Sequence, residues 1–280
     1  MRSIKTLVDK FVFPRLGAGQ FYEKMTAVMT ASGASVRTGC QLTRLLREGA
    51  RVRGAVARDS EGREEVFEAD YFISSAPLTE TIEAMDPPPP EDVLRACHRL
   101  RYRDHIGVQI KLKVNPFPDN WIYVHSKELK MARIANYRNF SRFMAEGEEV
   151  SPLTIEYFAF PGDAVSRRSD AALVELATAE LGTMNLIRVS DILSASVVRS
   201  AGAYPVCERD SQEQVQILKA WLDTMENVIP IGRCGLFKYN NQDHAIATGL
   251  LAARTALGLG KYDPWKVNID AEYHESGRAR

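Results

Sequence analysis

The residues best suited to chemistry gather near the C-terminus of the 280-residue chain, between positions 227 and 254. The segment 227–231, which is apolar after Asn227, predicts a short buried strand that a turn at Gly232 ends. A polar loop then leads into an apolar helix that we expect to begin near Asp243. A helix N-terminus carries roughly half a positive charge and several unpaired N–H groups, so it favours anions. Because this order also brings Arg233 to the same point, the sequence indicates a site for an anionic group such as a phosphate.

Each residue of the turn has two interpretations. Arg233 is either a bidentate donor to an anionic ligand or a surface arginine that follows a strand. Gly232 and Gly235 either let the backbone approach a ligand closely or serve as ordinary turn glycines. We expect the ligand-binding interpretation to hold for Arg233, whereas both interpretations stay open for Gly232 and Gly235, which we keep as candidates for cofactor binding.

The loop and helix start offer further candidates. Asn241 and Gln242 supply amide donors, unless they belong to an exposed loop. Asp243 either caps the helix or accepts a hydrogen bond from a ligand hydroxyl. His244 is a candidate general base, with a purely structural histidine as the alternative.

The rest of the chain must position this site. Apolar periodicity and capping residues predict helices at 21–31, 171–181 and 211–225. Strands are expected at 34–37, in a hairpin over 42–67, and at 71–77, 108–114, 121–124, 134–137, 154–160 and 192–198. The strand at 71–77 ends in small residues, among them Ser75 and Ala76, which permit close approach of a ligand.

These elements predict an α/β fold with an α+β insertion. We expect an incomplete Rossmann-like nucleotide-binding domain formed by residues 1–77 and 206–280, and a substrate-binding domain with a mostly antiparallel sheet at 78–205. The four consecutive prolines at 87–90 mark the start of a new section.

The composition narrows the class of protein. Thirty-six basic and 36 acidic residues cancel, so nothing favours nucleic-acid binding. The four cysteines match no zinc pattern, which predicts free thiols, no metal and a cytoplasmic location. No signal peptide is recognisable, and no segment approaches the ~20 apolar residues of a membrane span.

Three segments carry a family resemblance. They read FPRLGAGQFY at 13–22 with SGASV at 32–36, ADYFISSAP at 69–77, and GR at 232–233 with YNNQDH at 239–244. In order and spacing they resemble the superfamily of FAD-dependent amine oxidases, protoporphyrinogen oxidases and UDP-galactopyranose mutases. The resemblance implies FAD as cofactor, with the backbone of Leu42 at the adenine, Ser75 and Ala76 lining the cofactor cleft, and the region 232–244 at the flavin. It also implies hydride transfer from a C–N or C–C bond of a small substrate to the flavin, or redox-neutral sugar-nucleotide mutase chemistry.

One part of the superfamily pattern is missing. Gly17-Ala18-Gly19 is a lone G-x-G without the preceding strand of a βαβ nucleotide-binding unit, so the chain resembles the C-terminal ~60% of such a protein. We therefore expect a homo-oligomer or a partner chain that supplies this unit. The alternatives are a non-catalytic fragment or subunit, and a small-molecule binding protein without redox activity.

Overall fold

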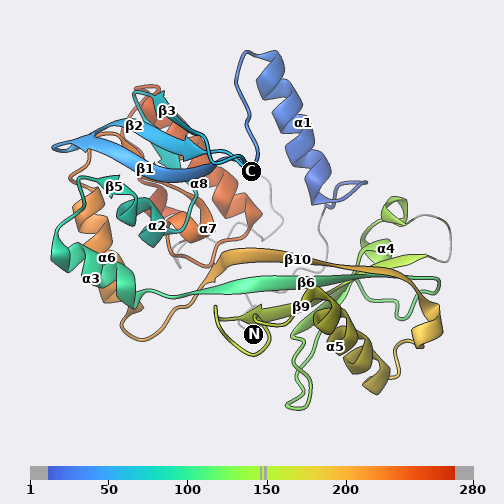
Figure 1. The fold of residues 1–280 in the computed structure, drawn as a ribbon. Helices are drawn as coiled ribbons and strands as arrows, with labels where there is room; N and C mark the ends of the chain where they lie inside the picture. The colour runs from blue at the N-terminus through green and yellow to red at the C-terminus, as the bar shows by residue number, and fades with distance from the viewer. Residues whose placement is uncertain (1–11, 146, 148–149, 269–280) are drawn as a thin grey trace, which may run out of the picture. The chain divides into compact units, whose positions relative to one another are not determined.

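The computed structural model describes residues 12–145, 147 and 150–268. These residues form two compact units, each coloured by sequence position in Figure 1. The first unit holds residues 37–102 and 204–268, and the second holds residues 12–36 and the described part of 103–203. The sequence predicted a cofactor-binding domain and a substrate-binding domain, and these domain limits with their binding roles stay a prediction.

The first unit contains two sheets. A meander of β1 (Gln41–Glu48), β2 (Arg51–Arg58) and β3 (Glu64–Glu68) is antiparallel, and β5 (Met85–Asp86) adds to β1 in parallel. The predicted hairpin over 42–67 is therefore confirmed and extended to three strands. Asp59 forms the β2–β3 turn because its Oδ1 accepts hydrogen bonds from the N–H groups of Glu61 and Arg63, both at 2.9 Å. The second sheet pairs β4 (Phe72–Ser74) with β11 (Val228–Pro230) in parallel.

Helices pack around these sheets and close the core of the first unit. They are α2 (Leu78–Glu83), α3 (Glu91–Arg99), α6 (Ser211–Leu222), α7 (Gly232–Gly235) and α8 (Gln242–Ala256). Leu78 and Ile82 of α2 and Leu218 of α6 are fully buried in one apolar cluster. This burial fixes the frame from which the loop between α7 and α8 projects.

Asn227 holds the two sheets of the first unit together. The residue is 1% exposed. Its Nδ2 donates to the carbonyl oxygens of Val52 (2.8 Å) and Asp70 (3.0 Å), and its Oδ1 accepts from the Val52 N–H (2.9 Å). One buried amide thus uses three of its four hydrogen-bonding positions to join β2, the approach to β4 and the start of β11.

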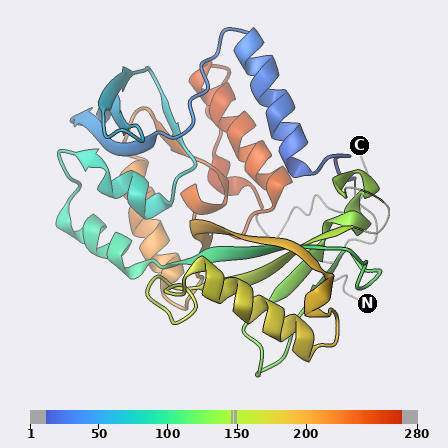
Figure 2. The ribbon, with the colours of Figure 1, turned by 45° about the vertical axis from the view of Figure 1, so that its right-hand side comes forward.

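The second unit is built on a five-stranded sheet with the order β10-β6-β9-β8-β7. Its strands are β6 (Tyr102–Leu112), β7 (Trp121–Tyr123), β8 (Arg133–Asn136), β9 (Ser151–Ala159) and β10 (Ile192–Pro205). Strands β6, β9, β8 and β7 pair antiparallel, as predicted. Helix α5 (Asp170–Thr183), which begins after the capping Ser169, lies along one face of the sheet (Figure 2). On that face Tyr157 is buried and donates to Glu180, so it belongs to the core.

Several local predictions need correction. No strand forms at 34–37, where a turn at Gly33 follows α1 (Ala18–Ala31) and residues without regular secondary structure lead on to β1. Gly232 does not simply end a strand, because it opens the short helix α7. Helices α2 and α3 flank the proline run and belong to the first unit, whereas the prolines predicted a new section.

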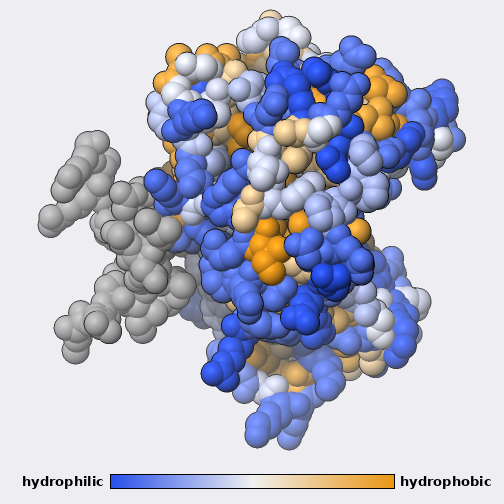
Figure 3. Space-filling model, turned by 90° about the vertical axis from the view of Figure 1, so that its left-hand side faces the viewer, coloured by the Kyte–Doolittle hydropathy of each residue, from blue (hydrophilic) through white to orange (hydrophobic). Residues whose placement is uncertain are grey.

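The overall class is α/β with mixed and antiparallel sheets, in agreement with the coarse prediction. The face drawn in Figure 3 is mostly hydrophilic, and its apolar side chains form only small patches. Within the part of the chain that the structure describes, no helix combines the length and apolar character needed to cross a bilayer.

Candidate functional site

The chain leaves β11 through a glycine that no other residue replaces without strain. Ile231 donates its N–H to the Ser74 carbonyl at 2.8 Å, which extends the parallel pairing by one hydrogen bond. Gly232 then adopts a φ of 74°, in the left-handed region that favours glycine. Its N–H donates to the Thr248 Oγ1 of α8 at 2.9 Å. The Gly232 N–H therefore serves the protein's own packing.

Gly235 allows α7 to lie directly on the chain that leaves β4. A Cβ atom built at Gly235 would stand 2.8 Å from the Ser74 carbonyl oxygen and 3.3 Å from that of Ala76. The structure thus brings Gly235 together with the predicted residues Ser75 and Ala76. The close approach that the sequence predicted at this glycine is made by the protein backbone itself.

Arg233 projects from α7 toward the start of α8. Its Nε donates to the Asn240 carbonyl at 2.8 Å, and its guanidinium carbon lies 4.5 Å from the ring centroid of Tyr204 and 5.0 Å from that of Tyr239. No carboxylate of the described residues forms an ion pair with it. Arg233 is half-buried and contacts two tyrosine rings and a backbone carbonyl, so no negative charge compensates that of its guanidinium.

The first turn of α8 is capped differently from the prediction. Asn241, and not Asp243, is the N-cap residue, and the N–H of Asn241 donates to Nδ1 of His244 at 3.2 Å. His244 is buried, whereas Gln242 and Asp243 are exposed. Because Nδ1 accepts this hydrogen bond, His244 completes a capping box with Asn241. A role of His244 as a base stays a prediction.

Asn240 lies beneath the loop and is 1% exposed. Its Oδ1 accepts from the Asn268 side chain at 3.0 Å, and its carbonyl accepts from Arg233. Its Nδ2 is buried without a hydrogen-bond partner among the described residues. A buried donor without an acceptor is unfavourable by about 1–3 kcal/mol, so this atom is a candidate contact for an added ligand.

Lys238 is a second cation next to this loop, but its donors are used. Its Nζ donates to the carbonyls of Trp265 (2.5 Å) and Val267 (3.0 Å). Burial lowers the pKa of Lys238, and the charge of Asp263 opposes this effect. We therefore infer that Lys238 holds the segment at Trp265 and Val267, which follows α8, in position.

Leu42 lies apart from the other predicted residues, on β1 in the other sheet of the unit. It pairs with Ala57 of β2 and packs against the apolar core, next to a bulge before Arg44. Its predicted adenine contact stays a prediction. The sequence did not predict that Tyr204 and Tyr239 lie around Arg233, because Tyr204 is 29 positions away and only the fold brings it close.

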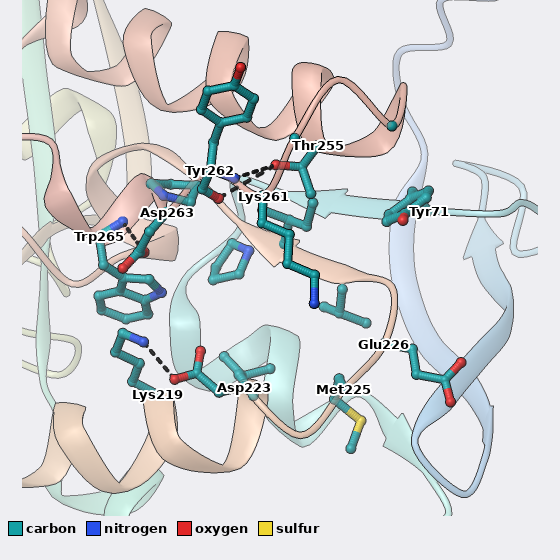
Figure 4. A pocket seen from close by; sticks show the side chains of 17 residues that line it. Tyr71, Lys219, Asp223, Met225, Glu226, Thr255, Lys261, Tyr262, Asp263 and Trp265 are labelled. Atoms are coloured by element: carbon teal, nitrogen blue, oxygen red, sulfur yellow. Dashed lines mark hydrogen bonds and ion pairs between the residues drawn. The ribbon is translucent and has the colours of Figure 1, made fainter.

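A separate groove of about 570 Å³ lies alongside β11 (Figure 4). Val228, Ile229 and Pro230 line it together with the aromatic residues Tyr262 and Trp265. An ion pair between Lys219 and Asp223 borders one side, and the Lys261 side chain extends into the groove (Figure 4). None of the residues predicted from the sequence as site residues lines this groove.

Comparisons with known proteins identify solved structures with a similar fold. No protein-family model and no curated protein matches the sequence. The structure is similar to that of reduced UDP-galactopyranose mutase, with a TM-score of 0.73 and 19% identity over 91% of this chain and 54% of that one. The chain shares the fold of UDP-galactopyranose mutase.

Two further solved structures agree. A putative protoporphyrinogen oxidase from Exiguobacterium sp. 255-15 matches with a TM-score of 0.63 and 14% identity, over 86% of this chain and 51% of that one. An oxidoreductase from Methanosarcina mazei matches with a TM-score of 0.54 and 12% identity, over 78% and 49%. The chain thus spans about half the length of these proteins. At the level of the fold, the resemblance inferred from the sequence is confirmed.

Proposed function

We propose that this chain is part of an FAD-dependent oxidoreductase that transfers a hydride from a small organic substrate to flavin. The observation that carries the proposal is the uncompensated guanidinium of Arg233, bound to Asn240 directly before the N-terminus of α8. The N–H groups of Gln242 and Asp243 have no acceptor within the helix, because they occupy its first two positions. Arginine and helix N-terminus together provide positive potential at one place.

These residues fit a bound FAD. Arg233 would neutralise an anionic part of the cofactor, and Nδ2 of Asn240 would gain the acceptor that it lacks. Ser75 and Ala76, held against α7, would form the adjoining wall of the cleft, with Gln242 and Asp243 at the helix start. When bound, FAD supplies the hydride acceptor, and the positive end of α8 would stabilise negative charge on it.

Binding of FAD to two arginine variants tests the proposal. Arg233→Met removes the uncompensated charge, whereas the control Arg254→Met removes a charge near the other end of α8, beside Tyr262. We expect the Arg233 variant to bind FAD at least tenfold more weakly, since a charge-assisted hydrogen bond contributes about 1.5–3 kcal/mol. Equal FAD affinity of the two variants would rule out this site.

We further propose that a partner chain completes the parallel sheet and carries a nucleotide-binding unit. Supporting this, β4 and β11 form a parallel sheet of two strands among the residues that the structure describes, and Ile73 of β4 is 41% exposed. Parallel sheets are normally covered on both faces and rarely stand as isolated pairs. Light scattering of the purified chain should show self-association through this open sheet, and a stable monomer would argue against it. We place this complex in the cytoplasm, which the four free cysteines support.

Sugar-nucleotide mutase chemistry is the second candidate, and the similarity to UDP-galactopyranose mutase favours it. A flavin-loaded protein that interconverts UDP-galactose isomers without net redox change would establish it. Oxidation of a substrate with reduction of the flavin would establish the first candidate.

A further inference from the structure

The groove alongside β11 has no part in the proposed cofactor site and lies wholly within the first unit (Figure 4). Its volume of about 570 Å³ is that of a pocket for a small molecule. Apolar residues form much of its lining: Val228, Ile229 and Pro230 of β11, and Leu222 and Met225 from α6 and the turn after it. A flat apolar molecule can therefore rest against β11.

Trp265 gives the groove an aromatic wall (Figure 4). The residue is half-buried, and its backbone is held from two sides. Its N–H donates to Oδ1 of Asp263 at 2.9 Å, and its carbonyl oxygen accepts a hydrogen bond from Nζ of Lys238 at 2.5 Å. An indole whose position is fixed in this way loses little freedom on binding and offers a face on which a planar ring stacks.

Lys261 brings a positive charge to this apolar groove. Its side chain extends into the groove, whose lining also includes Tyr71 (Figure 4). The N–H of the next residue, Tyr262, donates to Oγ1 of Thr255 at 3.1 Å, which ties the loop after α8 to that helix. Among the described residues, no carboxylate forms an ion pair with Lys261. Its ammonium group is therefore available to a ligand.

The carboxylates that line the groove are engaged elsewhere. Asp223 forms an ion pair with Lys219 at 2.6 Å, and Glu226 forms one with Arg51 at 3.3 Å. Asp263 accepts the indole residue's backbone N–H, as described above. The charge left for a ligand in the groove is that of the lysine in the loop after α8, and it favours an anion.

We propose that this groove binds a planar aromatic carboxylate. The ring system lies against the apolar residues of β11 and stacks on Trp265, and the carboxylate accepts a charge-assisted hydrogen bond from Nζ of Lys261. A protonated amine of the same shape meets Lys261 with like charge and is rejected. This site is separate from the residues proposed for the cofactor, so the inference goes beyond the proposed function and does not rest on it.

Titration of the purified chain with three probes of matched size tests the proposal. Naphthoate and naphthylmethylamine carry the same rings with opposite charge, and decahydronaphthoate carries the carboxylate on saturated rings. The indole N–H signals of the three tryptophans are followed by NMR; Trp121 and Trp221 do not line the groove, and the Trp265 signal is assigned by its loss in Trp265→Phe. We expect naphthoate alone to shift the Trp265 signal in a saturable way, with the saturated analogue binding about fivefold more weakly.

Two lysine variants separate the charge in the groove from a charge beside it. Lys261→Met should weaken naphthoate binding about tenfold, because the charge-assisted hydrogen bond is lost. Lys266→Met is the matched control, since this exposed lysine directly follows Trp265 and does not line the groove. It should leave naphthoate binding unchanged.

Arg233→Met distinguishes the groove from the candidate cofactor site, where another cation lies against aromatic rings. It should leave naphthoate binding unchanged. Loss of binding in Arg233→Met, an unchanged affinity in Lys261→Met, equal binding of the amine or of the saturated analogue, or equal shifts of all three tryptophan signals would overturn the proposal.

Discussion

Replacement of Gly235 by alanine tests whether this glycine is required by backbone packing. The added Cβ would stand 2.8 Å from the Ser74 carbonyl oxygen and 3.3 Å from that of Ala76, both of them backbone atoms. Backbone cannot move aside as a flexible side chain does, so overpacking of this kind should destabilise the protein by about 1–3 kcal/mol. The same change should loosen the contact between α7 and the segment at Ser75.

Gly249→Ala in α8 is the matched control. Its Cβ would meet only the Ile231 side chain, at an ordinary 3.8 Å, and alanine is favoured over glycine inside a helix by about 0.5–1 kcal/mol. Urea unfolding followed by circular dichroism should therefore show a lower midpoint for Gly235→Ala and an equal or higher one for Gly249→Ala. A Gly235→Ala protein as stable as the wild type would refute this packing.

Further predictions concern the core, the thiols and the response to pH. Asn227→Ala should lower the free energy of unfolding by about 2 kcal/mol or more in urea titrations, since the two buried groups of Val52 lose their partner at about 1–3 kcal/mol each and the half-buried Asp70 carbonyl loses one as well; a loss below about 1 kcal/mol would contradict this role. Burial raises the pKa of the Cys97 thiol to about 12, so a thiol reagent at neutral pH should react quickly at the exposed Cys40 and Cys207 and at Cys97 only after unfolding; rapid native-state labelling of Cys97 would be inconsistent with the core. Burial alone would raise the pKa of Glu156, but hydrogen bonds from His105 and Arg133 outweigh it and lower that pKa on folding. This carboxylate therefore stabilises the folded protein at pH values above its unfolded-state pKa near 4.5, and this stability is lost as the pH falls toward the folded-state pKa. Glu156→Gln should therefore make the free energy of unfolding depend less on pH in the acid range. An unchanged pH dependence would show that another carboxylate controls it.

Local patterns predicted much of the secondary structure. Alternation gave the strand that contains Val108 and Ile110, and Ser169 marked the start of α5, because each signal is contained in a few neighbouring residues. Asp243 was the wrong cap because Asn241 and His244 form a reciprocal pair that depends on the burial of the histidine.

The contacts that define the candidate site depend on distant residues. Arg233 was predicted as a ligand for an anion, but its position between Tyr204 and Tyr239 results from the pairing of β11 with β4 and the fold of the whole unit. Likewise His105 and Glu156 are 51 positions apart in the sequence, and only the register of β6 and β9 places them on one face. Register of this kind is fixed by tertiary packing, which a single sequence pattern does not contain.

The visible absorbance spectrum of the purified chain, before and after addition of FAD, tests the central claim most directly. We predict a protein-bound flavin spectrum after addition, removed by denaturation and weakened in Arg233→Met. A protein that stays colourless and takes up no FAD would contradict the proposal that the site at the start of α8 holds the cofactor.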